Sequence, residues 1–224
     1  MIVIAHRGAS AYEKENTLKA FKKAFDLNAR YLETDIQRTA EGKLILYHDY
    51  FLPDGKAVKD CTFAYLKRFN VPLLAELFET APQDLFINLE IKNDGNIYPQ
   101  IETQLFDFLN SSPSINKERL LISSFDFDTL KRVRALDGKI KIGVLTRDFD
   151  ITKPLELKAF SVNISHTRLT EDICLVCHKN GLKVLVYTVN DTALAKEVSA
   201  KGADGIFSDY PDLLNESFKP TPHI

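Results

Sequence analysis

Residues 160–189, FSVNISHTRLTEDICLVCHKNGLKVLVYTV, contain the pattern that decides the fold of this chain. Two short runs of apolar and β-branched residues, 160–164 and 183–189, flank a segment with helical spacing, 171–180. Gly181 stands where that helix should end. A strand, a helix and a second strand in this order predict two parallel strands joined by a right-handed crossover.

The same alternation extends along all 224 residues. Seven further runs have the character of strands: 2–5, 31–36, 44–47, 85–91, 120–123, 141–145 and 205–207. Five further segments have helical spacing: 17–27, 73–80, 98–109, 127–136 and 193–201. Suitable capping residues flank two of these helices: Asn16 or Thr17, Asp191 or Thr192, and Gly202. We therefore expect an α/β protein with a parallel sheet, formed by residues 1–224 as a single domain.

Nine runs are one too many for an eight-stranded α/β barrel. The link between runs 31–36 and 44–47 is too short for a crossover helix, which needs about ten residues or more. These two runs are expected to form an antiparallel hairpin that turns near Thr39 to Gly42. With the turn centred between Ala40 and Glu41, Glu33 lies opposite His48.

The composition excludes several classes of protein. The formal net charge is −2 and no basic run of five or more residues occurs, so we expect no nucleic-acid partner. The apolar run after Met1 is too short for a signal peptide, and no run approaches the roughly 18 residues of a membrane span. The three cysteines, an odd number, are expected to be reduced thiols. These features predict a cytoplasmic protein without stable membrane association, and they leave its oligomeric state open.

Polar clusters lie at the carboxyl ends of predicted strands, where parallel barrels build their sites. His6-Arg7-Gly8 follows the first run. Arginine can bind a phosphate with two parallel hydrogen bonds, histidine can transfer a proton, and Gly8 allows a sharp turn of the backbone. The alternative interpretation is a capped turn at the surface.

Glu33-Thr34-Asp35 places two carboxylates on one face of a strand, because residues i and i+2 point the same way. Such carboxylates repel each other unless a cation lies between them, and a hard divalent ion with oxygen ligands fits. In the alternative, both acids face solvent and pair with lysines, while Leu32, Thr34 and Ile36 form the buried face.

Asn88, Glu90 and Lys92 share one face of the run 85–91 and its end. Charged groups in a buried strand are costly unless they serve a site. Glu90 is therefore a candidate third metal ligand beside Glu33 and Asp35, and Lys92 a candidate phosphate ligand. The alternative is an ion pair at the end of the strand.

His48-Asp49 ends the second strand of the hairpin. If Glu33 faces His48, the carboxylates favour the protonated form of this histidine, which suits a general acid. The alternative is a local hydrogen-bonded pair.

The order of these motifs is more specific than any one of them. In chain order they are His6-Arg7-Gly8-Ala9-Ser10, Glu15-Asn16-Thr17 with Ala20-Phe21, Glu33-Thr34-Asp35, His48-Asp49 and Glu90-Ile91-Lys92. Together with VLVYTVN at 184–190 and GADGIFSDYP at 202–211, they closely resemble the glycerophosphodiester phosphodiesterase family over nearly the whole chain.

This resemblance implies a TIM-type (β/α)8 barrel, here with a small β-hairpin insertion after the second strand. It implies one divalent metal ion, Mg²⁺ or Ca²⁺, on Glu33, Asp35 and Glu90. It also implies general acid/base catalysis by two histidines and binding of the substrate by three further residues. The histidines are His6 and His48, and the binding residues are Arg7, Lys92 and Tyr187.

The sequence departs from the family pattern around the expected pocket. Lys14 replaces a proline, and residues 50–55, YFLPDG, replace a glycine-rich stretch. Tyr187 stands where the family has a tryptophan. None of these changes removes a metal ligand or a proton-transfer group, but they leave the accepted head group open.

The expected function is metal-dependent hydrolysis of glycerophosphodiesters to glycerol 3-phosphate and an alcohol, in lipid and glycerol metabolism. One alternative is a phosphodiesterase of the lysophospholipase D type, for which Tyr12, Tyr50, Phe51 and Leu52 would form an apolar rim. Another is a catalytically silent binding barrel.

Overall fold

The structure of the chain, a computed structural model, describes residues 1–212. Eight parallel strands close into a barrel, because β1 pairs with both β9 and β2. The strands are β1 (Ile2–Ala5), β2 (Tyr31–Arg38), β4 (Phe86–Ile91), β5 (Leu120–Ser124), β6 (Lys141–Thr146), β7 (Ser161–Ser165), β8 (Lys183–Tyr187) and β9 (Gly205–Ser208). A ninth strand, β3 (Leu44–Leu46), pairs with β2 outside the closed barrel and forms one further bridge, between Ile45 and Leu73. The predicted TIM-type barrel with a hairpin insertion is confirmed.

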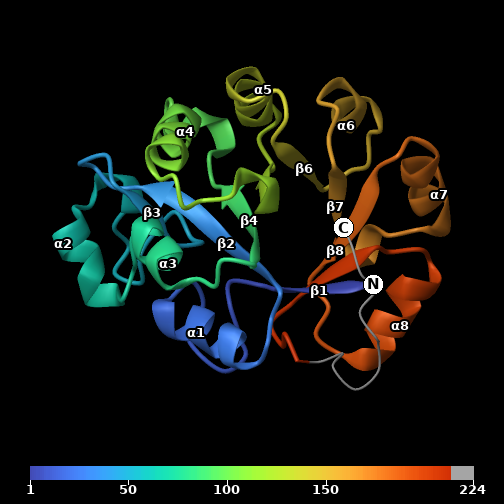
Figure 1. Cartoon of the computed structure of the whole chain (residues 1–224), viewed down its shortest axis with the longest axis horizontal. Coiled ribbons are helices and arrows are strands. Elements are labelled where there is room, and N and C mark those ends of the chain that lie inside the picture. Colours follow the sequence, from blue (N-terminus) through green and yellow to red (C-terminus); the bar gives the residue numbers. More distant parts are fainter. Residues whose placement is uncertain (213–224) are drawn as a thin grey trace.

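The helices lie around the outside of the barrel (Figure 1). They are α1 (Leu18–Asp26), α2 (Phe63–Leu66), α3 (Leu74–Thr80), α4 (Ile101–Ser111), α5 (Phe127–Leu136), α6 (Thr152–Glu156), α7 (Glu171–Lys179) and α8 (Thr192–Ala200). Of the proposed N-terminal caps, Thr17 and Asp191 are the ones used, and each accepts a hydrogen bond from a backbone N–H in the first turn. Gly181 and Gly202 follow the ends of α7 and α8 with positive φ, as expected. The short helices α2 and α6 were not expected, because one turn gives too little periodicity to recognise.

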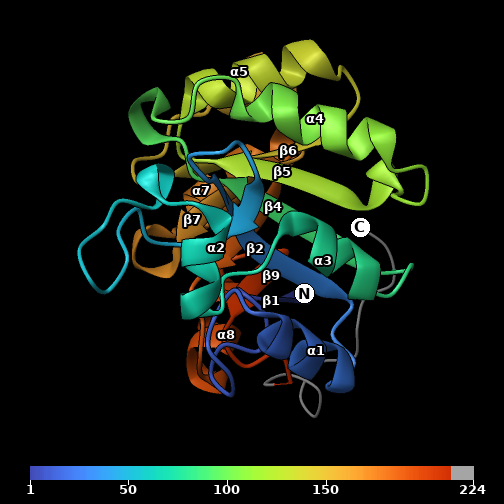
Figure 2. The ribbon, with the colours of Figure 1, turned by 90° about the vertical axis from the view of Figure 1, so that its left-hand side faces the viewer.

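The hairpin is antiparallel as expected, but its predicted register is wrong by one residue. Ile36 pairs with Leu46 and Arg38 with Leu44, so paired positions sum to 82 and the turn centres on Glu41. The Thr39 N–H donates to the Lys43 carbonyl (2.9 Å), which closes a longer loop than a two-residue turn. Glu33 therefore does not lie opposite His48. The segment with α2 that follows β3 forms its own small core and lies to one side of the barrel (Figure 2).

Both faces of the barrel wall are buried. Outward-facing side chains such as Leu32 and Ile36 pack in a core with Phe21 of α1. Inside, Ile4 and Phe207 pack with two other apolar residues, Ile2 and Leu185. Since alternate residues of a strand point to opposite faces, Glu33 and Asp35 point into the barrel while Leu32, Thr34 and Ile36 point toward the helices. The alternative in which these acids face solvent is wrong.

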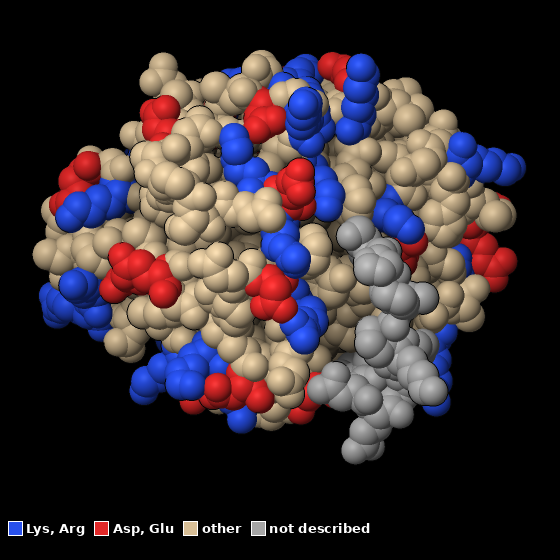
Figure 3. All heavy atoms as spheres, in the orientation of Figure 1, with Lys and Arg blue, Asp and Glu red and all other residues tan. Residues whose placement is uncertain are grey.

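Basic and acidic side chains are interspersed on the face shown in Figure 3, without a broad area of one sign. Among residues 1–212, none of the helices combines the length and the apolar character needed to traverse a bilayer.

The interior of the barrel leaves no room for a side chain at Gly205. A Cβ atom there would lie 2.6 Å from Ile2 Cγ1 and 2.9 Å from a methyl of Leu185. We expect Gly205→Ala to lower the free energy of unfolding by about 1–3 kcal/mol through overpacking, measured by urea denaturation. Gly138→Ala is the matched control, since no atom lies within 4 Å of its Cβ position. Equal stability of the two variants would contradict this account.

Candidate active site

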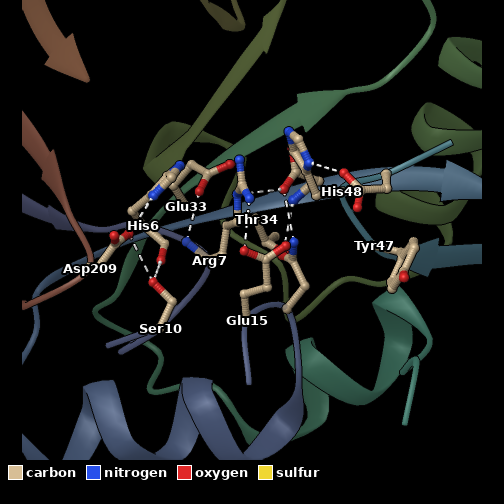
Figure 4. A network of polar contacts seen from close by, with 12 residues as sticks. His6, Arg7, Ser10, Glu15, Glu33, Thr34, Tyr47, His48 and Asp209 are labelled. Atoms are coloured by element: carbon tan, nitrogen blue, oxygen red, sulfur yellow. Dashed lines mark hydrogen bonds and ion pairs between the residues drawn. The ribbon is translucent and has the colours of Figure 1, made fainter. Parts of the chain in front are cut away.

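A cleft of about 560 Å³ opens at the carboxyl ends of the strands. Seven of the eight predicted site residues line it: His6, Arg7, Glu33, His48, Glu90, Lys92 and Tyr187. The eighth, Asp35, is fully buried and ion-paired to Arg7 and Lys92 at the base of this group. Figure 4 shows the contact between Arg7 and Glu33 and, beside it, the contacts of His6 with Asp209 and Ser10.

The three carboxylates meet because β2 and β4 are neighbours. Asp35 pairs with Glu90 across the two strands, and Glu33 lies two residues earlier on the same face of β2. One oxygen from each of the three groups lies within 4.8 Å of the others. Glu33 and Asp35 are almost completely shielded from solvent, at 2% and 0% exposure.

The charges of this cluster are only partly compensated by protein groups. Burial, reinforced by the neighbouring acids, raises the pKa of Glu33 well above its ordinary value and that of Glu90 to about 7. Burial also opposes ionisation of Asp35, but Arg7 and Lys92 outweigh it and lower the pKa of this carboxyl. Within residues 1–212, the buried Asp35 Oδ1 accepts no hydrogen bond. A cation among these oxygens would supply the missing compensation, so the residues fit a metal.

Two cations flank the carboxylates. Arg7 donates from its backbone N–H to Glu33 (2.8 Å), and its guanidinium contacts Glu15 (2.8 Å) and Asp35 (3.3 Å). Lys92 Nζ lies 2.9 Å from Glu90 and 3.7 Å from Asp35. Burial tends to lower the pKa of both bases, but the carboxylates outweigh it and raise both. The ion pair considered as an alternative for Lys92 is thus present, and it lies inside the cleft.

In the turn after β1, Gly8 is buried, while His6 and Arg7 are half-buried and line the cleft, so the alternative of a capped surface turn does not describe His6-Arg7-Gly8. Gly8 has a φ of +87°, and a Cβ there would lie 2.7 Å from the carbonyl carbon of Ala20 in α1. Only glycine combines this backbone conformation with so close an approach.

His6 is held by Asp209, which follows β9. His6 Nδ1 lies 2.7 Å from Asp209 Oδ1, and the hydroxyl of Ser10 donates to the same carboxylate oxygen (3.0 Å; Figure 4). Asn190 donates to the other oxygen (2.6 Å). Burial opposes ionisation of Asp209, yet these hydrogen bonds lower its pKa to about 2. With Nδ1 engaged, His6 can use Nε2 for proton transfer.

His48 has a similar but more exposed arrangement. Its Nδ1 lies 2.7 Å from Asp49 Oδ1, so the local pair considered as an alternative does form. The ring nevertheless lines the cleft. A positive charge on it contributes, after Arg7 and Lys92, to the lowered pKa of Asp35. The two imidazoles therefore stand in one cleft although they come from different loops.

Tyr187 forms part of the opposite wall. Its hydroxyl donates to the Thr146 carbonyl (3.1 Å), and its ring meets Phe125 edge-on at 6.1 Å between centroids. Leu145 and Phe207 complete an apolar surface facing the charged residues. This side of the cleft can accept the part of a substrate that carries no phosphate.

Three residues of the site were missed as functional candidates in the sequence. Asn16, considered only as a helix cap, is buried and donates to Asp35 (2.8 Å) while accepting from Thr34 (2.7 Å). Asp209 was noted only within a motif. It has the same signal as His6, a polar residue directly after a strand, and could have been found that way. Gln37 of β2 donates hydrogen bonds to the backbone around His48. Nothing in the sequence indicated this role, because a glutamine in a short β-hairpin is ordinary.

The sequence matches the glycerophosphoryl diester phosphodiesterase family over residues 6–213. The chain belongs to this family. The glycerophosphodiester phosphodiesterase of Caldanaerobacter subterraneus subsp. tengcongensis is 32% identical over 235 residues, covering 95% of this chain and 96% of the relative. The putative glycerophosphodiester phosphodiesterase YhdW of Bacillus subtilis is 33% identical, covering 96% of each chain. The predicted family and enzyme class are confirmed.

Solved structures agree with this assignment. The crystal structure of the glycerophosphodiester phosphodiesterase from Thermotoga maritima superposes with a TM-score of 0.82 at 26% identity, covering 96% of this chain and 97% of that one. An Oleispira antarctica phosphodiesterase in complex with the product sn-glycerol-3-phosphate has a TM-score of 0.87 at 25% identity, covering 96% and 95%.

The contact between His6 and Asp209 makes a pH-dependent contribution to stability. Because the folded-state pKa of Asp209 lies below the ordinary 3.8, this contribution is present above about pH 4 and is lost as the pH falls through about 2. We expect Asp209→Asn to be less stable than the wild type at pH 6, and the difference to shrink between about pH 4 and 2 in urea unfolding.

Asp26→Asn, which changes an exposed ion pair with Lys22, is the control for this experiment and should show no such trend. A difference between Asp209→Asn and wild type that is constant from pH 6 to 2 would contradict the assignment.

Proposed function

We propose that this enzyme hydrolyses glycerophosphodiesters to glycerol 3-phosphate and an alcohol, using one divalent metal ion and two histidines. The observation that carries the proposal is that His6, His48, Glu33 and Glu90 line one cleft and that Asp35 lies beside the other two carboxylates. We further propose that residues 1–224 act as one domain, in lipid and glycerol metabolism. Three unpaired, buried cysteines support a cytoplasmic location.

Glu33, Asp35 and Glu90 would hold the metal, and their all-oxygen ligand set favours Mg²⁺ or Ca²⁺. When bound, the ion supplies charge stabilisation for the phosphoryl oxygens. Arg7 and Lys92 are proposed to bind the phosphate, since both remain charged and line the cleft. Arg7 has N–H groups beyond those engaged by Glu15 and Asp35, and these can donate to phosphate oxygens.

The reaction proposed for these groups has two stages. One histidine accepts the proton of the glycerol 2-hydroxyl, whose oxygen attacks the phosphorus. The bond from phosphorus to the head-group oxygen breaks, and the other histidine donates a proton to the departing alcohol. Water then opens the cyclic phosphate to glycerol 3-phosphate, with the proton transfers reversed. Holding the hydroxyl beside the phosphorus makes the first attack intramolecular, which lowers its entropic cost.

We propose His48 as the general acid and His6 as the base. Support comes from the environments of the two rings, since the charge of His48 interacts favourably with Asp35. His6 is instead held by Asp209, whose carboxylate stabilises the imidazolium that forms when His6 takes a proton.

The two alternatives differ from this proposal in observable ways. A lysophospholipase D needs an apolar rim, and Tyr12 and Phe51 are exposed at 46% and 62%. Leu52, expected in that rim, is buried instead. The ratio of rates on glycerophosphocholine and lysophosphatidylcholine separates the two substrates. A silent barrel would lack one of the reacting groups, whereas His6, His48, Glu33 and Glu90 line this cleft and Asp35 lies beside the other two carboxylates.

Replacement of either histidine should remove proton transfer while leaving the phosphate ligands in place. We expect His6→Ala and His48→Ala to lower kcat on glycerophosphocholine by about 10²–10⁴-fold with little change in KM, measured by release of glycerol 3-phosphate. His178→Ala is the control, because His178 pairs with Asp204 and does not line the cleft. Full activity of His6→Ala would refute the scheme.

The metal should affect both turnover and thermal stability. Removal of the metal with a chelator should abolish turnover. Addition of Mg²⁺, Ca²⁺ or Mn²⁺ to chelated protein should raise Tm, because ion binding to the folded state relieves the repulsion between the carboxylates. Asp35→Asn should weaken both effects, whereas Asp84→Asn, on an exposed ion pair with Arg30, should alter neither. Full activity in chelator without a metal-induced rise in Tm would exclude this metal site.

A further inference from the structure

The segment that carries His48 has no regular secondary structure of its own. β3 ends at Leu46, and residues 47–49 belong to no helix or strand. The Tyr47 N–H donates to the Asp35 carbonyl (3.1 Å) and continues the hairpin by one hydrogen bond. The position of the imidazole therefore depends on what holds the carbonyl groups of this segment.

The side chain of Gln37 donates hydrogen bonds to the carbonyl groups of all three residues, 47–49. Gln37 Nε2 lies 2.8 Å from the Tyr47 oxygen, 3.1 Å from the His48 oxygen and 2.8 Å from the Asp49 oxygen. A primary amide has two N–H groups, so one of them is shared between two carbonyls. Gln37 lies on β2, two residues beyond Asp35, and is completely buried. The metal-ligand strand thus also carries the residue that holds the His48 segment.

Tyr98 fixes which way the amide points. Its hydroxyl donates to Gln37 Oε1 (2.7 Å), and this leaves the Nε2 side facing the carbonyls. A flipped amide would place its oxygen against three carbonyl oxygens. Burial raises the pKa of the Tyr98 hydroxyl, which stays a donor. The Tyr98 N–H in turn donates to Asn93 Oδ1 (2.8 Å), and Asn93 follows Lys92 directly.

A second contact joins the same two segments. The hydroxyl of Tyr50 donates to Asp94 Oδ2 (3.0 Å) and accepts from the Asp94 N–H (3.1 Å). The loop with His48 and the loop after Lys92 are therefore connected by Gln37–Tyr98–Asn93 and by Tyr50–Asp94. Because a buried amide without partners is costly, Gln37 resists displacement of the segment that it binds.

We propose that Gln37 is a positioning residue for proton transfer by His48, with Tyr98 setting the orientation of its amide. The inference rests on the proposed function, in which His48 transfers a proton and Lys92 binds the phosphate. Gln37 would hold His48 in position relative to Lys92. Gln37 does not line the cleft, and it acts only through the backbone of residues 47–49.

The test is a pair of double-mutant cycles on glycerophosphocholine. Gln37→Glu keeps the side-chain shape but removes both amide N–H donors, and we expect kcat to fall at least about 30-fold with KM changed less than about 2-fold. In the His48→Ala background the same substitution should cause no further fall. In the His6→Ala background it should retain its full effect, because His6 is held by Asp209 instead.

Tyr98→Phe deletes only the hydroxyl and carries the same test if Gln37→Glu does not fold; its expected fall in kcat is about 3–10-fold. Gln104→Glu is the matched control, since its acceptor for Arg38 is kept and it should have wild-type kcat. Absence of turnover by the wild type on any glycerophosphodiester would reject the proposed function itself. With an active wild type, unchanged kcat in folded Gln37→Glu or Tyr98→Phe, or equal losses in both histidine backgrounds, would overturn the role of Gln37.

Discussion

The burial of three carboxylates at the mouth of the barrel is the constraint on which the rest of the site depends. Their oxygens approach within 4.8 Å. At that separation two full charges repel by about 3 kcal/mol even with an effective dielectric constant of about 20. Arg7 and Lys92 offset part of this repulsion, and Asn16 donates to Asp35, yet one Asp35 oxygen accepts no hydrogen bond from residues 1–212. The described part of the chain contains two large apolar cores. Burial of their side chains stabilises the folded barrel and offsets the cost of the repulsion between the carboxylates.

The barrel holds these groups in place because it joins segments that are far apart in the sequence. The turn after β1 packs on α1 through Gly8, and the Arg7 N–H binds Glu33 on β2. Asp209, after the last strand, reaches back to His6 after the first. Closure of the barrel brings β1 and β9 together, so the two ends of the described chain build one part of the site. The carboxylates, Lys92 and His48 come from β2, its hairpin and β4, and the apolar side comes mainly from β6, β8 and the segment after β5.

The cleft has two chemically distinct sides. Glu33, Glu90 and Lys92 form a charged side suited to a metal and a phosphate, whereas Phe125, Leu145 and Phe207 form an apolar side that includes Tyr187. The apolar side can contact the part of a substrate that carries no charge. The sequence departs from the family pattern at Tyr187 and in the 50–55 segment, and both lie around the cleft or beside the loop with His48.

The sequence by itself determined the strand–helix alternation, the hairpin and the identity of the polar groups at the strand ends. These features follow from periodicity and from residues adjacent in the chain, which is why the strands 2–5 and 205–207 were placed within one residue of their observed bounds. Only the tertiary structure decided the hairpin register, because a loop from Thr39 to Lys43 and a tighter turn satisfy the same alternation. It also decided the partners Asp209, Asn16 and Gln37, since contacts across 203 or 19 residues depend on barrel closure and strand order rather than on local pattern.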